Sequence, residues 1–277
     1  MKLRLQLTLS LGVLLVISAN VTSAQNQQGR VQKRVYKFKE AENKEMEYAM
    51  FVPTGYDKNK PTPLIVALHG LNSTPQGIMR YPGFTKHAEK HGYIVVAPMG
   101  YNRRGWYGSF GKGGGRRGRD PKNLGELSEK DVMNVLAIAR KEFNIDPKRI
   151  YLFGHSMGGG GTWHLGLKYP SIWAALAPIA PAIYRSPNSL TKITHMPVII
   201  VQGDKDRLVS VKIARRWVAK MKELKMDHKY IEVEGGNHVL PAFQHFPEIF
   251  AFFNTHQKRP EKPVAAKKPR STSGDRK

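Results

Sequence analysis

The chain has 277 residues, enough for one large α/β domain with a full hydrophobic core, and no second domain is required. It contains no cysteine, which excludes a cysteine nucleophile, a disulfide framework and a lipoprotein anchored through a cysteine. The formal net charge is +24 at pH 7, but no nucleic-acid-binding motif accompanies it. A nucleic-acid partner is therefore not expected.

The first residues have the pattern of a cleaved export signal. Lys2 and Arg4 precede an apolar stretch at 7–17, and the small residues at 22–24 provide a cleavage site. The apolar stretch is shorter than the roughly 20 residues that a membrane-spanning helix needs. We therefore expect a signal peptide at 1–24 and a secreted or periplasmic protein with no transmembrane segment in the mature chain. An uncleaved anchor is the alternative.

Three further segments follow the leader. We expect a polar disordered segment at 25–32, a single catalytic domain at 33–257 and a basic disordered tail at 258–277. Within the domain, period-two alternation and short apolar runs indicate strands, and longer amphipathic stretches indicate helices. The expected strands are 34–38, 46–52, 63–68, 93–98, 150–153, 172–179, 197–201 and 228–233. The expected helices are 84–91, 128–143, 157–168, 214–225 and 241–255.

Strands and helices alternate along most of the domain. This order predicts an α/β fold in which a mostly parallel sheet carries helices on both faces. The run 64–68 is apolar throughout, as expected of a strand that is buried on both faces. The connection 100–124 is long and rich in glycine and arginine, and compact domains seldom contain such a loop without a functional reason.

A short strand at 150–153 is followed by Gly154-His155-Ser156-Met157-Gly158 and by a predicted helix. A strand, a tight turn and a helix in this order are typical of a nucleophile elbow, in which the serine occupies a strained turn. Gly154 and Gly158 lack side chains, so the strand and the helix can approach each other closely. Because the five-residue pattern also occurs by chance, Ser156 needs partners elsewhere in the chain.

A serine hydroxyl needs a base that takes its proton and an acid that orients the base. Two carboxylates, Asp204 and Asp206, follow the strand at 197–201, and His238 follows the next strand. In enzymes with a nucleophile elbow, the acid and then the histidine come after the serine, each behind a strand. Each residue alone is also typical of an ordinary turn, but their order predicts a triad of Ser156, Asp206 or Asp204, and His238.

Two backbone N–H groups have to stabilise the oxyanion that forms on a substrate carbonyl. Met157 follows the nucleophile and Leu71 follows the first fully apolar strand, so these two residues are the predicted donors. His69, His155 and His164 are predicted to be structural. The sequence contains no metal-ligand cluster, phosphate-binding glycine loop or dinucleotide fingerprint, so no cofactor is expected.

Positive charge is concentrated in two segments. The loop from Arg103 to Arg119 holds six lysines and arginines and no acidic residue, and the tail from Lys258 to Lys277 holds eight against two acidic residues. Such segments often only make a surface soluble; the sharper alternative is a polyanionic partner, either an acidic polysaccharide or an anionic surface such as lipid. Trp106 and Tyr107 lie in the same loop and are expected to line the substrate pocket or to anchor the loop.

Several motifs occur in a characteristic order between Tyr48 and Lys258. They are PLIVALHG from Pro63, FNIDP from Phe143, GHSMGG from Gly154 with GTW from Gly161, GDKD from Gly203 with Val209, GNH from Gly236, and IFAFF from Ile249. In this combination the chain resembles a bacterial esterase group of the α/β-hydrolase superfamily that includes polyhydroxyalkanoate-depolymerase-like and feruloyl-esterase-like proteins. The resemblance implies the α/β-hydrolase fold, and it favours Asp206 as the triad acid. The basic loop departs from the usual pattern of the group.

Together these observations predict an exported serine esterase that acts on a small or polymer-linked ester. His238 would deprotonate Ser156, and the N–H groups of Met157 and Leu71 would stabilise the oxyanion. Two alternatives stay open. One is a serine peptidase with the same fold and triad, and the other is a polyanion-binding protein with a vestigial site.

Overall fold

A computed structural model describes residues 28–258 of the chain. The signal peptide predicted at 1–24, and all but the first residue of the tail predicted at 258–277, lie outside these residues. Among the described residues, no helix combines the length and the apolar composition that crossing a membrane requires.

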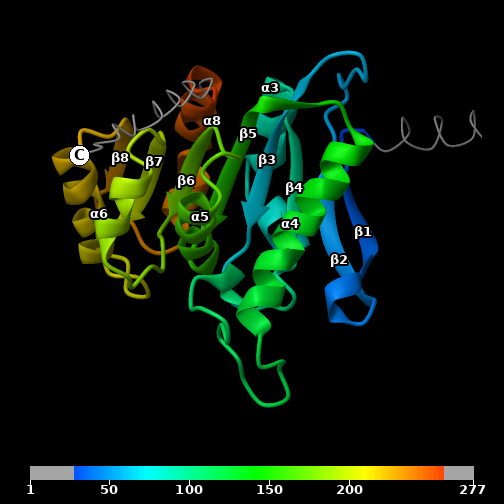
Figure 1. The fold of residues 1–277 in the computed structure, drawn as a ribbon. Coiled ribbons are helices and arrows are strands. Elements are labelled where there is room, and N and C mark those ends of the chain that lie inside the picture. The colour runs from blue at the N-terminus through cyan, green and yellow to red at the C-terminus, as the bar shows by residue number, and fades with distance from the viewer. Residues whose placement is uncertain (1–27, 259–277) are drawn as a thin grey trace, which may run out of the picture.

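Within residues 28–258, eight strands form one sheet in the order β1-β2-β4-β3-β5-β6-β7-β8 (Figure 1). β1 pairs antiparallel with β2 and β2 with β4, whereas the strands from β3 to β8 run parallel to one another. The strands are β1 (Val31–Phe38), β2 (Lys44–Phe51), β3 (Thr62–Leu68), β4 (Ile94–Pro98), β5 (Ile145–His155), β6 (Ala175–Ile179), β7 (Val198–Gly203) and β8 (His228–Val233).

Helices cover both faces of this sheet because successive strand residues point to opposite faces. Leu64 and Val66 of β3 pack in the cluster that contains α4, α5 and α6, and Ile65 and Ala67 pack in the cluster that contains α2, α3 and α8. The helices are α2 (Pro75–Met79), α3 (Phe84–His91), α4 (Leu124–Glu142), α5 (Met157–Lys168), α6 (Val211–Glu223), α7 (Leu240–Gln244) and α8 (Phe246–Thr255), with short 3-10 turns η1 (Lys39–Ala41), η2 (Trp106–Gly108) and η3 (Pro187–Lys192).

The mostly parallel sheet between two helical layers confirms the predicted α/β class, and α3, α5 and β8 have the predicted bounds. The helix predicted at 241–255 is divided into α7 and α8, because Pro247 lies in the first turn of α8 and has no N–H to continue the preceding helix. The prediction of disorder at 25–32 is wrong for Val31 and Gln32, which pair with β2.

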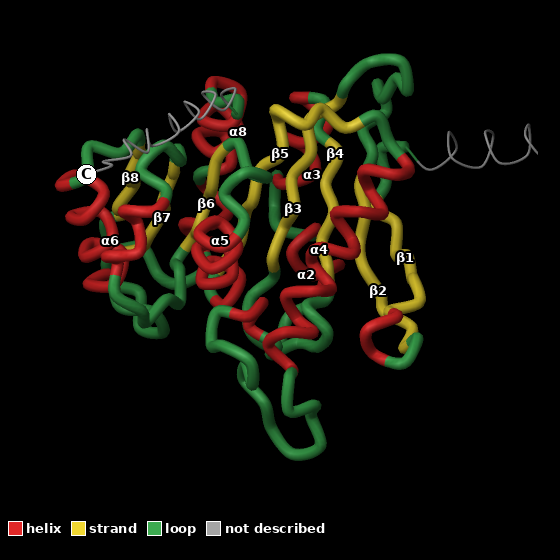
Figure 2. Tube along the Cα trace, viewed as in Figure 1, coloured by secondary structure: helices red, strands yellow, loops and turns green. Residues whose placement is uncertain are grey.

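The carboxyl ends of the parallel strands lie at one edge of the sheet, the lower edge in Figure 1. This carboxyl edge receives the turns after β3, β5, β6, β7 and β8. The connection between β4 and α4 projects farthest from it, and Figure 2 shows this connection mainly as loop. Ligands of open α/β sheets bind at such an edge, so the chemistry predicted from the sequence is expected there.

Candidate active site

Ser156 occupies the turn between β5 and α5 with φ 58° and ψ −116°, a conformation that is strained for a residue with a side chain. The turn is possible because two neighbours are glycine. A Cβ atom at Gly154 would lie 2.2 Å from the carbonyl oxygen of Gly158, and a Cβ atom at Gly158 would lie 2.0 Å from the carbonyl oxygen of Leu68. The strand, turn and helix therefore have the geometry of a nucleophile elbow.

Asp206 and His238 meet at the same edge from the turns after β7 and β8. Nδ1 of His238 donates a hydrogen bond to Oδ2 of Asp206 at 2.7 Å, and both side chains are largely buried. Oδ1 of Asp206 accepts hydrogen bonds from the backbone N–H groups of Leu208 and Val209, each at 2.8 Å. Asp204 makes no contact of this kind, and its Oδ1 is buried without a hydrogen-bond partner. Of the two predicted acids, the structure brings only Asp206 to the histidine.

The carboxyl group of Asp206 is held in its ionised form. Burial acts to raise its pKa, but the hydrogen bond from His238 and those from Val209 and Leu208 outweigh burial, and the pKa lies below its ordinary value. Gln202 adds a further hydrogen bond from Nε2 to Oδ2 of Asp206 at 2.9 Å. A fixed negative charge thus orients the His238 ring, which leaves Nε2 as the ring nitrogen that can accept a proton.

His155, which the sequence predicts to be structural, directly precedes Ser156 and helps to hold the turn that carries His238. Its Nε2 lies 2.8 Å from the carbonyl oxygen of His238, which can only accept, so this nitrogen carries the proton. Nδ1 then accepts from the hydroxyl of Tyr81 at 2.7 Å. Burial lowers the pKa of His155 to about 4, so the ring is neutral near pH 7.

No hydrogen bond joins the Ser156 hydroxyl to the His238 ring in the part of the chain that the structure describes. The two residues nevertheless lie at one site, because the ring of His155 is centred 4.9 Å from that of His238 and His155 directly precedes the serine. Hydrogen bonds between a nucleophile and its base are often long in free enzymes and shorten when substrate binds.

The two predicted oxyanion donors are also at this edge. Met157 is the first residue of α5, and a Cβ atom at Gly70, the residue before Leu71, would lie 3.5 Å from Cβ of Ser156. Within residues 28–258, neither the N–H of Leu71 nor that of Met157 donates a hydrogen bond. Two unengaged donors close to Ser156 are what stabilisation of an oxyanion would require.

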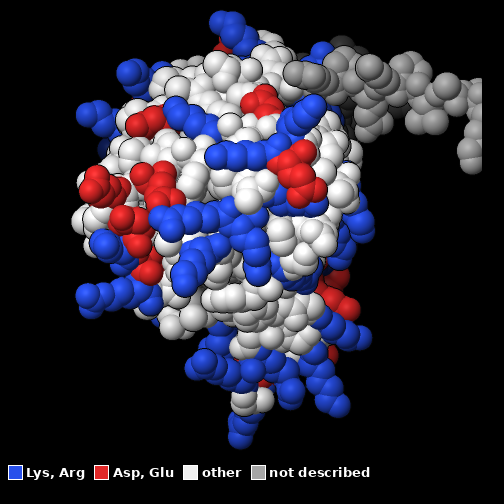
Figure 3. Space-filling view, turned by 90° about the vertical axis from the view of Figure 1, so that its left-hand side faces the viewer, with Lys and Arg blue, Asp and Glu red and all other residues white. Residues whose placement is uncertain are grey.

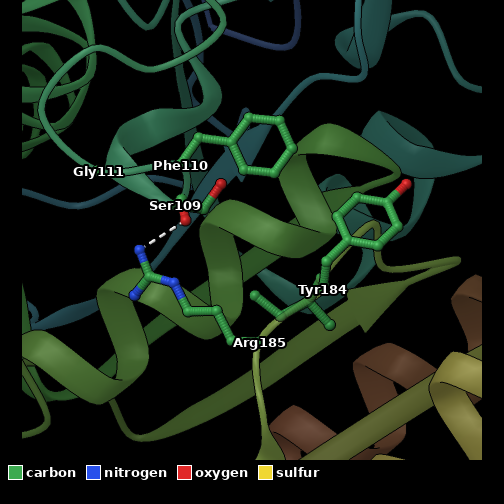
Figure 4. Close-up of a pocket in the computed structure, with 6 residues that line it drawn as sticks. Ser109, Phe110, Gly111, Tyr184 and Arg185 are labelled. Atoms are coloured by element: carbon green, nitrogen blue, oxygen red, sulfur yellow. Dashed lines mark hydrogen bonds between the residues drawn. The ribbon is translucent and has the colours of Figure 1, made fainter.

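Figure 4 shows a pocket of about 330 Å³ that is lined in part by Ser109. It lies near α5, because a Cβ atom at Gly160 would be 3.7 Å from Oγ of Ser109. Phe110 and Tyr184 form its aromatic walls, with ring centroids 6.0 Å apart, and Arg185 closes one side by donating to the carbonyl oxygen of Ser109 at 2.6 Å. Ile183, which lines the pocket, follows Ala182, and the N–H of Ala182 donates to the carbonyl oxygen of Ser156 at 3.0 Å, so the pocket lies near the elbow. The sequence did not predict that Phe110 and Tyr184 line a pocket. Both residues lie in connections that leave the carboxyl edge, Phe110 after β4 and Tyr184 after β6.

The prediction that Tyr107 lines the substrate pocket is wrong. Its side chain is fully buried, its hydroxyl donates to the carbonyl oxygen of His69, and its backbone N–H donates to Oγ of Ser128. Trp106 is not a lining residue either, but its ring stacks on Phe110 with centroids 4.0 Å apart. Tyr107 therefore anchors the loop between β4 and α4, and Trp106 supports one wall of the pocket.

A buried network holds the loop and the pocket against α5. Glu129 of α4 accepts hydrogen bonds from His164, Lys168 and Tyr169, and Nδ1 of His164 lies 3.4 Å from Arg185. Burial would raise the pKa of Glu129, but these three donors lower it to about 2, so the carboxylate is ionised. Among residues 28–258, no three His, Asp or Glu side chains converge as metal ligands.

Comparison with known proteins identifies the family of the chain. Residues 40–256 match the model of the Esterase family. The S-formylglutathione hydrolase of Rattus norvegicus is 33% identical over 146 residues, which are 49% of this chain and 51% of that protein. Poly(3-hydroxyalkanoate) depolymerase C of Paucimonas lemoignei is 33% identical over 143 residues, 50% of this chain and 32% of the relative. The chain thus spans about half or less of the length of these curated relatives.

Among solved structures, a ferulic acid esterase from the anaerobic fungus Anaeromyces mucronatus superimposes with a TM-score of 0.63 and 18% identity, covering 82% of this chain and 90% of the other. This likeness shows the shared fold, which is the α/β-hydrolase fold predicted from the sequence. Because the family model covers most of the chain, the protein belongs to the Esterase family, a family of carboxylic ester hydrolases.

Proposed function

We propose that the chain is a carboxylic ester hydrolase in which Ser156 is the nucleophile, His238 the base and Asp206 the acid that orients the base. The observation that carries the proposal is the 2.7 Å hydrogen bond from His238 to Asp206 at the edge where the elbow holds Ser156. Membership of the Esterase family supports the reaction class.

The reaction follows from the position of these groups. Nε2 of His238 takes the hydroxyl proton while Oγ of Ser156 attacks the ester carbonyl, and the N–H groups of Leu71 and Met157 hold the resulting oxyanion. Collapse of this intermediate breaks the C–O bond, and His238 returns the proton to the leaving alcohol. A water molecule, deprotonated by His238, then attacks the acyl-enzyme, and Ser156 leaves with the proton while the acid is released.

The aromatic pocket gives the proposal a substrate preference. Its volume of about 330 Å³ and its walls of Phe110 and Tyr184 suit an apolar, ring-sized group on the acyl or the alcohol side of the ester. A ferulic acid esterase has the same fold, and ferulate esters are therefore suitable test substrates beside acetate, polyester and thioester compounds.

Replacing the nucleophile tests the proposal directly. Ser156→Ala should lower the hydrolysis of p-nitrophenyl acetate by about 10⁴-fold or more, because no other group can form the acyl-enzyme. Ser189→Ala in η3 is the matched control and should keep full activity. Circular dichroism checks that both variants are folded. Substantial hydrolysis by folded Ser156→Ala protein would refute the assignment.

We also propose that the enzyme is exported. The support is the pattern at 1–24, which has a basic start, an apolar stretch and small residues before the cleavage point. Amino-terminal sequencing of protein recovered from the periplasm or the medium should start at Gln25. Protein that stays in the membrane fraction with an intact leader would favour the uncleaved anchor.

A polyanionic partner is the third part of the proposal. It is supported by the exposed arginines at 116, 117 and 119 of the loop between β4 and α4. Retention on a heparin matrix should fall steeply with salt, because bound cations are released when basic side chains neutralise a polyanion. Retention that does not depend on salt would contradict an electrostatic partner.

A further inference from the structure

Large apolar side chains are exposed mainly around the active site. Eight such side chains are exposed among residues 28–258, and six of them lie at the carboxyl edge, in the turns after β3, β4, β6, β7 and β8 or, for Leu240, at the start of α7. We call these six the apolar rim: Leu71, Phe110, Tyr184, Leu208, Val239 and Leu240. The other two, Val31 and Val35, lie on β1 at the end of the strand order.

The rim is wider than the pocket for one ester group. Phe110 and Tyr184 line the pocket, but Leu208 follows the triad acid by two residues, and Val239 follows His238 directly. Leu208 is 74% exposed although it is apolar. Exposed apolar side chains that gather on several loops mark surfaces that contact a partner, and these lie at the same edge of the sheet as the elbow of Ser156.

Basic side chains accompany the rim. Arg103 lies beside the Leu71 turn, because its carbonyl oxygen accepts from the N–H of Asn72 at 2.9 Å, and Arg207 directly precedes Leu208. Figure 3 shows basic side chains covering the projecting lower end of the molecule, where Figure 1 places the loop between β4 and α4. Within the described chain, the exposed basic side chains of these loops that have no ion-pair partner include Arg103, Arg116, Arg117, Arg119, Lys122, Lys205 and Arg207.

Few acidic groups offset this charge. Asp120 is paired with Arg104 at 2.9 Å, and Asp206 with His238. Asp204 is half-buried, so Glu234 is the exposed acid of the turns behind β7 and β8. The carboxyl edge therefore presents apolar side chains next to unpaired positive charge.

We propose that the carboxyl edge docks onto an anionic lipid surface, with the apolar rim entering the interface and the loop arginines contacting the headgroups. An acidic polysaccharide would account for the arginines but leave the rim exposed to water, and a neutral polyester would account for the rim alone. A lipid surface matches both features, since apolar burial and attraction to anionic headgroups together drive interfacial binding. The proposal narrows the polyanionic partner proposed above to a lipid surface, and it rests on the proposed catalysis only in placing Ser156 at the docked face.

Vesicle flotation tests the docking with protein that starts at Gln25, so that the apolar stretch of the predicted leader is absent. The protein should float with vesicles of equal parts phosphatidylcholine and phosphatidylglycerol, should not float with phosphatidylcholine alone, and should dissociate as salt rises. Leu208→Ser should weaken binding by about tenfold, because a leucine no longer enters the interface. Arg117→Gln and Arg119→Gln should each weaken it by about fivefold, as expected for a basic side chain near an anionic surface.

Matched controls come from the far side of the sheet. Val35→Ser removes an equally apolar, 53% exposed side chain from β1, and Lys141→Gln removes an exposed charge at the end of α4; neither should change vesicle binding. The arginine, Val35 and Lys141 variants should hydrolyse soluble p-nitrophenyl acetate like the unchanged protein. Leu208→Ser is compared by vesicle binding alone, because the N–H of residue 208 contacts Asp206. Ser156→Ala should lose hydrolysis but bind vesicles normally, which separates the docking from the proposed catalysis.

Three outcomes would overturn the docking proposal. One is the absence of binding to anionic vesicles. Another is binding that Leu208→Ser and the arginine variants leave unchanged, which would assign the contact to the basic tail. The third is retention on polygalacturonate without vesicle binding, which would assign the loop arginines to an acidic polysaccharide.

Discussion

The elbow at Ser156 and the loop between β4 and α4 meet at the same edge of the sheet, but their backbones are constrained in different ways. At the elbow, a Cβ atom at Gly158 would lie 2.0 Å from a backbone oxygen of β3, so strand and helix are in direct contact. The loop has a packed base, where Tyr107 is buried, and a tip, where a Cβ atom at Gly118 would meet nothing within 4 Å. The elbow is therefore constrained by local sterics, whereas the loop is held by packing at its base and by polar contacts nearer its tip, such as the ion pair between Arg104 and Asp120.

The largest expected effect compares glycines of these two regions. Gly158→Ala should prevent folding or destabilise the protein by about 4 kcal/mol or more, because the clash is with backbone that cannot move away. Gly118→Ala should cost about 1 kcal/mol, the price of a left-handed conformation in open space. Urea unfolding measures both. Equal losses for the two variants would show that the loop tip is as constrained as the elbow.

The next effect separates the two carboxylates behind β7. Asp206→Asn should lower kcat by about 10³- to 10⁴-fold, because the amide no longer orients and stabilises the charged His238 ring. Asp204→Asn is the matched control and should change kcat by less than about threefold, since its carboxylate does not touch the histidine. Steady-state kinetics on p-nitrophenyl acetate decide the assignment. A larger loss of kcat in Asp204→Asn than in Asp206→Asn would make Asp204 the triad acid.

His155→Gln should affect both rate and stability. Loss of the hydrogen bond from His155 to the carbonyl oxygen of His238 should lower kcat by about tenfold, because His238 is then held less precisely. The pKa of His155 is about 4 in the folded protein and near 6.5 in the unfolded chain, so the unfolded chain binds more protons between these values and stability falls as the pH falls. Because His155 takes up a proton more readily in the unfolded chain, the free energy of unfolding should fall by about 2 kcal/mol when the pH is lowered from 7 to 5.

Urea unfolding of the unchanged protein and of His155→Gln at these two pH values measures that contribution. The variant should lose less stability on acidification than the unchanged protein does. His195→Gln, at an exposed position, should leave the pH dependence as it is. An unaltered pH dependence in His155→Gln would contradict a buried, neutral His155.

The smallest effects distinguish two neighbours in the loop. Phe110→Ala should raise KM for a ring-bearing ester by about fivefold relative to acetate, because one aromatic wall of the pocket is lost. Tyr107→Phe should leave KM unchanged and cost about 1 kcal/mol of stability through the lost hydrogen bond to His69. A change of KM in Tyr107→Phe would mean that the base of the loop contacts substrate.

Some features of the protein followed from local sequence. Alternation of strands and helices determined the α/β class, and the family match confirms the esterase resemblance. The elbow could be predicted because its five residues carry their own steric requirement, and the order of acid and histidine along the chain indicated which turns meet it. The structure brings Asp206 and His238 together as the order implied, and their catalytic roles remain to be tested by the variants above.

Tertiary contacts decided the rest, because they join residues that are far apart in the sequence. Tyr107 and Phe110 are three residues apart in one glycine-rich loop, yet only packing against His69 and α5 buries the first and leaves the second open to the pocket. His155 resembles any turn histidine until the turn after β8 brings the His238 carbonyl to its ring. Side-chain burial and long-range hydrogen bonds depend on the whole fold, and local pattern does not contain them.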